Sequence, residues 1–446
     1  MTLANLNFNL DQARRLSLSG QVVQAELLYV SVLKGWPGQL SALRALADLA
    51  MHRDDASRAL QYLDEAVRRY PDDQELALSY AAVLAKAHRI PEAQQWLEAV
   101  VAKSPKYFAA WLFLGQLRQA TGDSLGALRA WFEAIIGAQR SGQWLGEDTT
   151  EPQILAQVIL AVEKVRNARE MLLYESYGEL RKQLGANALQ RVDKALAGYL
   201  RKWNATPPDP RQKPRFFYFP DLPDLPYYDP FLQAWAPALQ SSFEVIRNDA
   251  VRVFAEDQKF QPFLVRTGGN KTSEHITGSG KEPAWDAFFF YRHGERFDQN
   301  HDRCPQTSAV LESIELCRIS DQAPEICFSV LGPGTQIMPH YGVSNVRLVM
   351  HLPLVIPGNC ALNLLDAGEH HWEEGKLVMF DDTFQHEAWN RSDTPRIVLL
   401  MDCWNPHLTP VEKLAVKQLI EMITAFQLAD RAAQIAEEGQ DSLRES

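Results

Sequence analysis

The spacing of hydrophobic residues changes character about halfway along the chain. Up to Trp203, apolar side chains recur at steps of three and four residues, which is the period of an amphipathic helix. After Phe254 they gather in short runs rich in valine, isoleucine, leucine and phenylalanine, divided by turn signals such as the Gly-Pro-Gly at 332–334. Short, regularly spaced strands of this kind are typical of a jelly roll or related double-sheet barrel. The pattern therefore predicts a multidomain chain, with a helical region followed by an all-β domain.

The first third of the chain repeats with a period of 34 residues. Three sets of residues keep this step: Ala25, Ala59, Ala93 and Ala127; Pro37, Pro71 and Pro105; and Tyr29, Leu63, Leu97 and Trp131. Alanine lets two antiparallel helices approach closely, and proline cannot continue a helix, so it fixes the turn. A unit of this length and pattern resembles the tetratricopeptide repeat. The resemblance implies stacked helix pairs with a concave face, a common platform for peptides or protein partners.

The remaining boundaries follow from changes in composition. Proline is dense between Ala205 and Pro230, which disfavours both helix and central strand and is typical of a linker or the entry to a new domain. We therefore predict four segments: a repeat array over residues 1–145, a helical extension or cap over 146–205, the β domain over 206–410, and a C-terminal helix and tail over 411–446.

The last segment has a recognisable helix start. Thr409 can act as an N-cap, Pro410 suits the first helical position, and Glu412 completes a capping box. We expect this helix to run to about Ala436 and the polar end after it to be frayed.

Composition narrows the class of protein. The chain has 446 residues, 46% of them hydrophobic, and a net charge of -11, which disfavours a surface built for nucleic acid. The amino terminus lacks the features of a secretory signal, and no stretch of about 18 apolar residues is present to span a membrane. The five cysteines are odd in number and lack C-x-x-C spacing, so neither a disulfide framework nor a thiolate zinc site is indicated. A cytoplasmic protein is expected.

Two histidines in the strand-rich part have the spacing of a metal site. His340 lies in PGTQIMPHYG, His386 follows 46 residues later in MFDDTFQHEAW, and Arg396 follows after ten more. Neutral imidazoles from two strands can hold a divalent transition metal and leave positions open, as oxygen chemistry requires. The usual non-haem iron site adds a carboxylate two residues after the first histidine, but here that residue is Gly342. Spacing alone therefore leaves open whether these are ligands or ordinary strand histidines.

The sequence around these residues carries a family resemblance. The stretches SVLGPGTQIMPHYGVSNVRLVMHLPLVIP and WEEGKLVMFDDTFQHEAWNRSDTPRIVLLMDCWNPHLTP resemble the aspartyl/asparaginyl beta-hydroxylase family of iron(II)- and 2-oxoglutarate-dependent dioxygenases. The resemblance covers about Cys327 to Pro410. It implies a double-stranded β-helix fold and a need for iron(II), 2-oxoglutarate and O2. It also implies two histidine ligands without a metal-bound carboxylate, a pattern that Gly342 fits.

The resemblance assigns roles to five residues. His340 and His386 match the iron ligands. Arg396 matches the residue that pairs with the distal carboxylate of 2-oxoglutarate, and a guanidinium fork suits this role because it binds both oxygens at once. Ser329 matches a hydroxyl that helps to hold the same carboxylate, and His351 matches a histidine that contacts the other end of the cosubstrate.

Three further positions bear on catalysis and substrate. Asp382 matches an acid that bonds iron-bound water rather than iron, although Asp381 and Asp382 could also simply shape the turn before the second histidine. The family often has arginine where this chain has Val349, and a substrate carboxylate buried against valine would stay unpaired. An acidic target is therefore in doubt, and Arg292 in FFFYRHGERF is a candidate for replacing the lost charge in substrate binding.

These expectations combine into one function with two alternatives. The favoured function is hydroxylation of an unactivated C–H bond on an amino-acid side chain of a protein or peptide that the repeat array engages. The first alternative keeps the chemistry but changes the substrate to a small molecule, a lipid headgroup or a carrier-bound amino acid. The second is a non-catalytic adaptor, against which the intact His340, His386 and Arg396 weigh.

Overall fold

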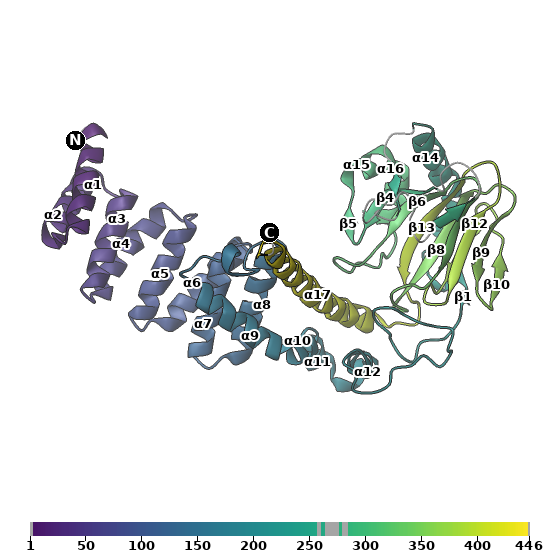
Figure 1. Ribbon diagram of the computed structural model, residues 1–446, viewed down its shortest axis with the longest axis horizontal. Coiled ribbons are helices and arrows are strands. Elements are labelled where there is room, and N and C mark those ends of the chain that lie inside the picture. Colours follow the sequence, from purple (N-terminus) through teal and green to yellow (C-terminus); the bar gives the residue numbers. More distant parts are fainter. Residues whose placement is uncertain (1–2, 257–259, 264–275, 279–283, 445–446) are drawn as a thin grey trace. The chain divides into compact units, whose positions relative to one another are not determined.

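The computed structural model describes residues 3–256, 260–263, 276–278 and 284–444. These residues form two compact units, one of Met1–Leu172 with Ala425–Ser446 and the other of Leu173–Thr424. The first unit is helical and the second contains the strands (Figure 1).

The first unit is a succession of antiparallel helix pairs, each packed on the next (Figure 1). Its helices are α1 (Leu3–Leu18), α2 (Val22–Gly35), α3 (Leu40–His52), α4 (Ala56–Arg69), α5 (Gln74–Lys86), α6 (Ile90–Lys103), α7 (Phe108–Ala120), α8 (Ser124–Arg140) and α9 (Leu155–Asn167). The four alanines spaced 34 residues apart lie on the second helix of each pair and are fully buried, because a larger side chain would hold the paired helices apart. The three prolines lie in the turns that follow α2, α4 and α6. The predicted repeat array is confirmed.

The end of the C-terminal helix α17 (Pro410–Arg444) belongs to this first unit. Phe426 packs against Phe132 of α8 with ring centroids 4.9 Å apart, and the Arg169 guanidinium lies over the Phe426 ring at 5.0 Å. The helix runs past the predicted end at Ala436 because the following stretch contains no proline and only Gly439 as a poor helix former, which costs about 1 kcal/mol.

The second unit contains two antiparallel sheets. In the described part of the chain, a large sheet has eight strands in the order β1-β11-β8-β13-β6-β4-β2 with β5 beside β4, and a small sheet has five in the order β10-β9-β12-β7-β3. The strands are β1 (Tyr227–Tyr228), β2 (Gln261–Pro262), β3 (Ile276–Gly278), β4 (Trp285–Arg292), β5 (Glu295–Arg296), β6 (Ile326–Leu331), β7 (Thr335–His340), β8 (Arg347–Val355), β9 (Cys360–Leu364), β10 (Gly368–His370), β11 (Val378–Phe380), β12 (His386–Asn390) and β13 (Arg396–Trp404). The predicted jelly-roll architecture is confirmed.

The large sheet separates two hydrophobic cores. One lies between the sheet and the helices α14 (Phe243–Ala255) and α16 (Pro305–Glu312), and the other lies between the two sheets. Because successive strand residues point to opposite faces, Leu348 and Met350 of β8 face the helices, whereas Val349 faces the small sheet. Arg347, Val349 and His351 of β8 therefore point into the space between the sheets.

The proline-rich stretch runs along two loops of the β domain. Gln212 bridges to Phe384, and Phe217 bridges to Ser344. The Gln212 amide donates to the Asp381 carboxylate at 2.8 Å, and the Lys213 N–H donates to the Thr383 carbonyl at 2.8 Å. These hydrogen bonds fix the stretch on the domain, and its end forms β1, which pairs with β11 at the edge of the large sheet.

The helix before that stretch, α12 (Gln190–Tyr199), is fastened to the start of α17. The Arg191 guanidinium donates to both carboxylate oxygens of Glu412, at 2.7 and 2.6 Å, and lies over the ring of Phe219. Glu412 also accepts the N–H of Thr409 at 2.9 Å, which completes the predicted capping box. Two helices far apart in sequence thus share one buried carboxylate.

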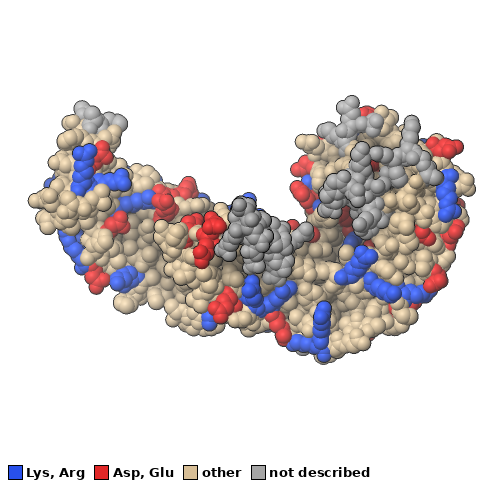
Figure 2. Space-filling model, in the orientation of Figure 1, with Lys and Arg blue, Asp and Glu red and all other residues tan. Residues whose placement is uncertain are grey.

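Charged side chains of both signs lie next to one another over both units on the face seen in Figure 2. Among the helices of the described residues, none combines the length and the apolar character that crossing a bilayer requires.

We predict that Glu412→Gln lowers the free energy of unfolding of the second unit by about 2 kcal/mol, because it leaves Arg191 without its bidentate partner and weakens the helix cap. Urea unfolding followed by circular dichroism measures this change. The matched control is Glu315→Gln, which removes the more exposed pair with Lys413 and is expected to change stability by less than about 0.5 kcal/mol. Equal effects of the two substitutions would contradict the role given to Glu412.

Candidate active site

The two histidines that the sequence singled out lie opposite each other on neighbouring strands of the small sheet. His340 ends β7 and His386 begins β12, and the antiparallel register of these strands pairs the two residues directly. Their ring centroids are 4.1 Å apart. This geometry brings two residues 46 positions apart into one cross-strand pair.

Hydrogen bonds to the backbone orient both imidazoles. The Nδ1 atom of His340 lies 2.8 Å from the carbonyl oxygen of Met338, and Nδ1 of His386 lies 3.0 Å from that of Phe384. A carbonyl only accepts, so Nδ1 carries the proton in each ring and Nε2 carries the lone pair that a metal requires. Burial lowers the pKa of His386 to about 4, so this ring is neutral at pH 7.

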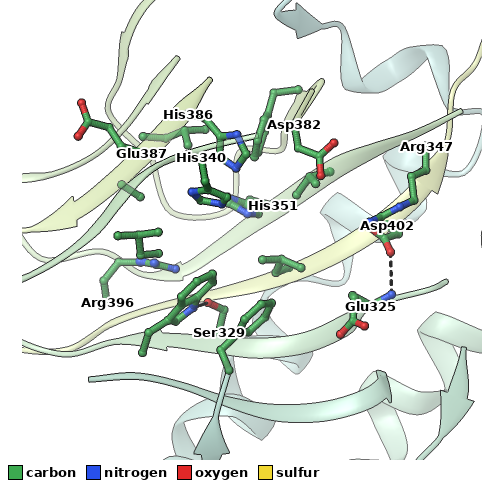
Figure 3. A pocket seen from close by; sticks show the side chains of 18 residues that line it. Glu325, Ser329, His340, Arg347, His351, Asp382, His386, Glu387, Arg396 and Asp402 are labelled. Atoms are coloured by element: carbon green, nitrogen blue, oxygen red, sulfur yellow. Dashed lines mark hydrogen bonds and ion pairs between the residues drawn. The ribbon is translucent and has the colours of Figure 1, made fainter. Parts of the chain in front are cut away.

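The large sheet contributes the other side of the same cavity. Ser329 of β6, His351 of β8 and Arg396 of β13 all line it together with the two histidines, and its volume is about 180 Å³ (Figure 3). The adjacent order β8-β13-β6 in the sheet places these three side chains beside one another. The structure therefore brings together the two predicted ligands and the three predicted cosubstrate residues.

Arg396 is a buried cation without an anionic partner among the described residues. Only 2% of it is exposed, and neither Nε nor Nη1 donates a hydrogen bond to the part of the chain that the structure describes. Its guanidinium lies over the Trp372 ring at 5.0 Å, and burial lowers its pKa to about 10. A buried charge of this kind is unfavourable unless an anion joins it, so the site is suited to a carboxylate ligand.

Two neighbours of Arg396 also have unused hydrogen-bonding capacity. Ser329 accepts a hydrogen bond from the Trp285 indole at 3.0 Å, and that indole stacks on Phe263 with ring centroids 4.1 Å apart. Neither ring nitrogen of His351 has a partner among the described residues. Burial, and then the positive charge of Arg396, hold the pKa of His351 well below its usual value, so the ring is neutral.

Asp382 occupies the space that a side chain at position 342 would need. A Cβ placed on Gly342 would overlap the Asp382 carboxylate, and the Gly342 N–H donates to the Asp382 carbonyl at 2.6 Å. The carboxylate faces the cavity from the turn between β11 and β12. Neighbouring Asp381 faces away, accepting from the Thr383 N–H and from Gln212, so it is Asp381 that shapes the turn.

Sequence reasoning missed four charged residues that line the cavity: Glu325, Arg347, Glu387 and Asp402. The period of two along each strand was the signal that could have found Arg347 and Asp402. Arg347 lies four residues before His351 on β8, and Asp402 lies six residues after Arg396 on β13, so each points to the same side as a predicted site residue. Glu325 lies just before β6 and four residues before Ser329.

Arg292 is not among the described residues that line this cavity. Trp285 and Arg292 are the two ends of β4, and it is Trp285 that reaches the cavity. The Arg292 guanidinium instead lies over the Phe289 ring at 4.5 Å and donates to the Phe263 carbonyl at 3.0 Å. A substrate contact by Arg292 stays a prediction, and the guanidinium that lines the cavity besides that of Arg396 belongs to Arg347.

Comparison with known proteins places this geometry in a family. A family model for aspartyl/asparaginyl beta-hydroxylase matches residues 240–406, and tetratricopeptide-repeat models match residues 10–74 and 50–117. The mouse aspartate beta-hydroxylase domain-containing protein 2 is 31% identical over 249 residues, which are 55% of this chain and 69% of that protein. The chain belongs to the aspartyl/asparaginyl beta-hydroxylase family.

The chain matches only part of the length of two other relatives, and these carry different names. The chain matches 64% of the human aspartate beta-hydroxylase domain-containing protein 2, so it spans just under two thirds of that relative, at 31% identity. An ornithine lipid ester-linked acyl 2-hydroxylase from Rhizobium tropici is 30% identical over 191 residues, which are 42% of this chain and 64% of that protein. The relatives of this beta-hydroxylase family member thus include a protein named as a lipid hydroxylase.

We predict that Gly342→Ala weakens cobalt(II) binding by roughly tenfold, because the new methyl group displaces the Asp382 carboxylate. The double variant Gly342→Ala with Asp382→Ala removes the overlap. Its loss of unfolding free energy should therefore be smaller than the sum of the losses in the two single variants, by about 1 kcal/mol or more. Metal titration and urea unfolding of the four proteins form a double-mutant cycle. Additive losses would show that Asp382 does not occupy this space.

We predict that the metal-free protein loses stability as the pH falls from about 6.5 to 4. In this range the unfolded chain protonates His386, whereas burial keeps the ring neutral in the folded state until the pH approaches its lowered pKa of about 4. The loss from this residue is about 3 kcal/mol. Urea unfolding at several pH values measures how steeply the free energy of unfolding changes with pH. This dependence should be shallower for His386→Gln and the same as in the wild type for the exposed control His407→Gln. An unchanged slope for His386→Gln would contradict the prediction.

Proposed function

We propose that this protein is an iron(II)- and 2-oxoglutarate-dependent dioxygenase that hydroxylates an unactivated C–H bond on an amino-acid side chain of a protein or peptide. The observation that carries the proposal is the buried guanidinium of Arg396, with nitrogens that lack partners among the described residues, in the same cavity as the paired imidazoles of His340 and His386.

The histidine pair suits a ferrous ion. His340 and His386 would hold it through their Nε2 atoms, since both Nδ1 atoms are directed at backbone carbonyls. Two neutral nitrogen donors leave most coordination positions open, as is needed for a bidentate cosubstrate and O2. Asp382, whose Oδ1 atom has no hydrogen-bond partner among the described residues, would accept a hydrogen bond from a water molecule bound to the ion.

The polar groups of the large sheet suit 2-oxoglutarate. Arg396 would bind its distal carboxylate, and the Ser329 hydroxyl, which already accepts from Trp285, has its proton available for the same group. His351, neutral and without a partner among the described residues, is suited to donate to the other end of the cosubstrate. The dianion would thus satisfy the buried polar atoms that the folded chain leaves unsatisfied.

The chain itself contributes binding, orientation and the exclusion of water. When bound, the iron and its cosubstrate supply O2 activation and oxygen transfer, with 2-oxoglutarate converted into succinate and CO2. Apolar side chains between the polar groups, among them Leu362, Phe380, Ala388 and Leu400, keep the cavity dry and strengthen the electrostatic contacts within it.

The helical unit supports a protein or peptide substrate. The helices α5, α7 and α9 line a groove of about 370 Å³ that contains Leu78, Leu112, Phe113 and Ile154 and no charged side chain among its described lining residues. Such a surface suits an apolar peptide segment better than a metabolite.

A second candidate function keeps the chemistry and changes the substrate to a lipid or another small amino-acid-bearing molecule. The relative from Rhizobium tropici that is named as an ornithine lipid hydroxylase favours it. A non-catalytic adaptor is the third and least favoured function. Binding a partner protein through the repeats would not require the buried Arg396, which lacks an anionic partner among the described residues, to share a cavity with two imidazoles.

The test is cosubstrate turnover by the full-length protein. With iron(II), ascorbate and 2-oxoglutarate, wild-type protein is expected to release succinate slowly, and His386→Ala is expected to reduce the rate by at least about 100-fold because it removes one of two metal ligands. His407→Ala, on an exposed residue, is the matched control and should keep the wild-type rate. Indistinguishable rates for wild type and His386→Ala would favour the adaptor.

A further inference from the structure

The cavity has two electrostatically different ends. Arg396 and Ser329 lie at one end, together with Glu387, whose two oxygens already accept hydrogen bonds from Gln336 and Asn363 (Figure 3). The imidazoles lie along one side, and the other end contains Glu325, Arg347, Asp382 and Asp402. We call these last four residues the acidic end, because they contain three carboxylates and one guanidinium. On the proposed function, 2-oxoglutarate occupies the Arg396 end, so the acidic end is left for the substrate.

The single guanidinium of the acidic end is already engaged. Arg347 forms an ion pair with Asp402, and the two side chains are 14% and 1% exposed. The second oxygen of Asp402 accepts the Glu325 N–H at 2.8 Å. Asp402 and Arg347 therefore compensate each other, and Arg347 is a weak site for a substrate carboxylate.

Glu325 lines the cavity and has one carboxylate oxygen engaged in hydrogen bonds. Its Oε1 atom accepts the His293 N–H at 2.7 Å and lies 2.8 Å from the His293 ring nitrogen. The Oε2 atom accepts no hydrogen bond from any residue that the structure describes, although the side chain lines the cavity and is only 15% exposed. His293 thus fixes the carboxylate in place and leaves Oε2 available.

Asp382 provides a second available oxygen. The residue is 8% exposed, and its Oδ1 atom is buried without a hydrogen-bond partner among the described residues. Because a buried carboxylate oxygen is unfavourable when unsatisfied, this atom indicates that a donor enters the cavity here.

From these contacts we infer that the substrate brings a cationic nitrogen, an ammonium or a guanidinium, into the acidic end. Glu325 Oε2 receives it, and the nearby Asp382 carboxylate, whose Oδ1 also accepts from metal-bound water on the proposed function, adds negative charge. Beside the mutually compensated Arg347–Asp402 pair, the carboxylates of Glu325 and Asp382 make this end attractive to a cation and repulsive to a carboxylate. Val349 also lines the cavity, and its side chain has neither a positive charge nor a hydrogen-bond donor for a substrate carboxylate. The substrate class is therefore a basic side chain or an amine-bearing headgroup, and Glu325 is the specificity-determining residue.

The experiment measures binding of small probes next to the metal site. Full-length protein is loaded with manganese(II) and saturated with 2-oxoglutarate, and proton line broadening is recorded for n-butylammonium, n-butylguanidinium and butyrate, since the paramagnetic ion broadens only signals of molecules held close to it. We expect the two cations to be broadened and to bind at least about tenfold more tightly than butyrate.

Variants assign the effect to one carboxylate. Glu325→Gln keeps an oxygen for His293 and removes the charge, so it should weaken cation binding by about tenfold, and Glu325→Lys should make butyrate the preferred probe. The matched control Glu369→Gln changes an exposed glutamate outside the cavity lining and should leave binding unchanged. Circular dichroism confirms that each variant is folded.

The possible failures are distinguishable. The inference would be overturned if butyrate were broadened as much as the cations, if no probe were broadened, or if Glu325→Gln had no effect. If the protein still forms succinate in such a case, the proposed function is unaffected. Absence of both succinate formation and broadening of 2-oxoglutarate would overturn the proposed function and this inference with it.

Discussion

The antiparallel register between β7 and β12 is the constraint on which the site depends. It pairs His340 directly with His386, so that both imidazoles enter the space between the sheets. Because side chains alternate along a strand, a slip of one residue would turn one histidine out of the cavity. The register is held on both sides of β12, since β9 pairs with it residue by residue from His386 to Asn390. The hydrophobic core between the sheets, including Ile337 and Ala388, penalises any other alignment.

Around this pair the domain tolerates polar groups that folding alone would not favour. Arg396, His351 and Asp382 are all buried, and each has a polar atom without a partner among the described residues. Their unfavourable burial has to be offset by the apolar packing of the large sheet and its helices. Such groups gather in one cavity because there a ligand can satisfy them, and their arrangement divides the cavity into a cationic and an acidic end.

The loops that carry Gly342 and Asp382 are held from outside the sheets. Arg215 donates its backbone N–H to the Gly342 carbonyl at 3.1 Å, and Gln212 and Lys213 bond the turn at Asp381–Thr383. One short segment therefore supports both loops, which are also joined directly by the hydrogen bond from the Gly342 N–H to the Asp382 carbonyl. Its proline content, which predicted a linker or the entry to a new domain, prevents a helix from forming where the segment follows both loops.

The sequence by itself determined the helical repeats, the strand-rich second half and six residues of the cavity. Those features are local, because periods of 34, 3.6 and two residues are visible along the chain and the motifs around His340 and His386 carry the family resemblance. Only the tertiary structure decided that Asp382 fills the space beside Gly342, that Arg347 is paired with Asp402, and that Arg292 points elsewhere. The physical reason is that a charge acquires its role from its partners across the sheet, and strand pairing between residues tens of positions apart is not written in any local pattern.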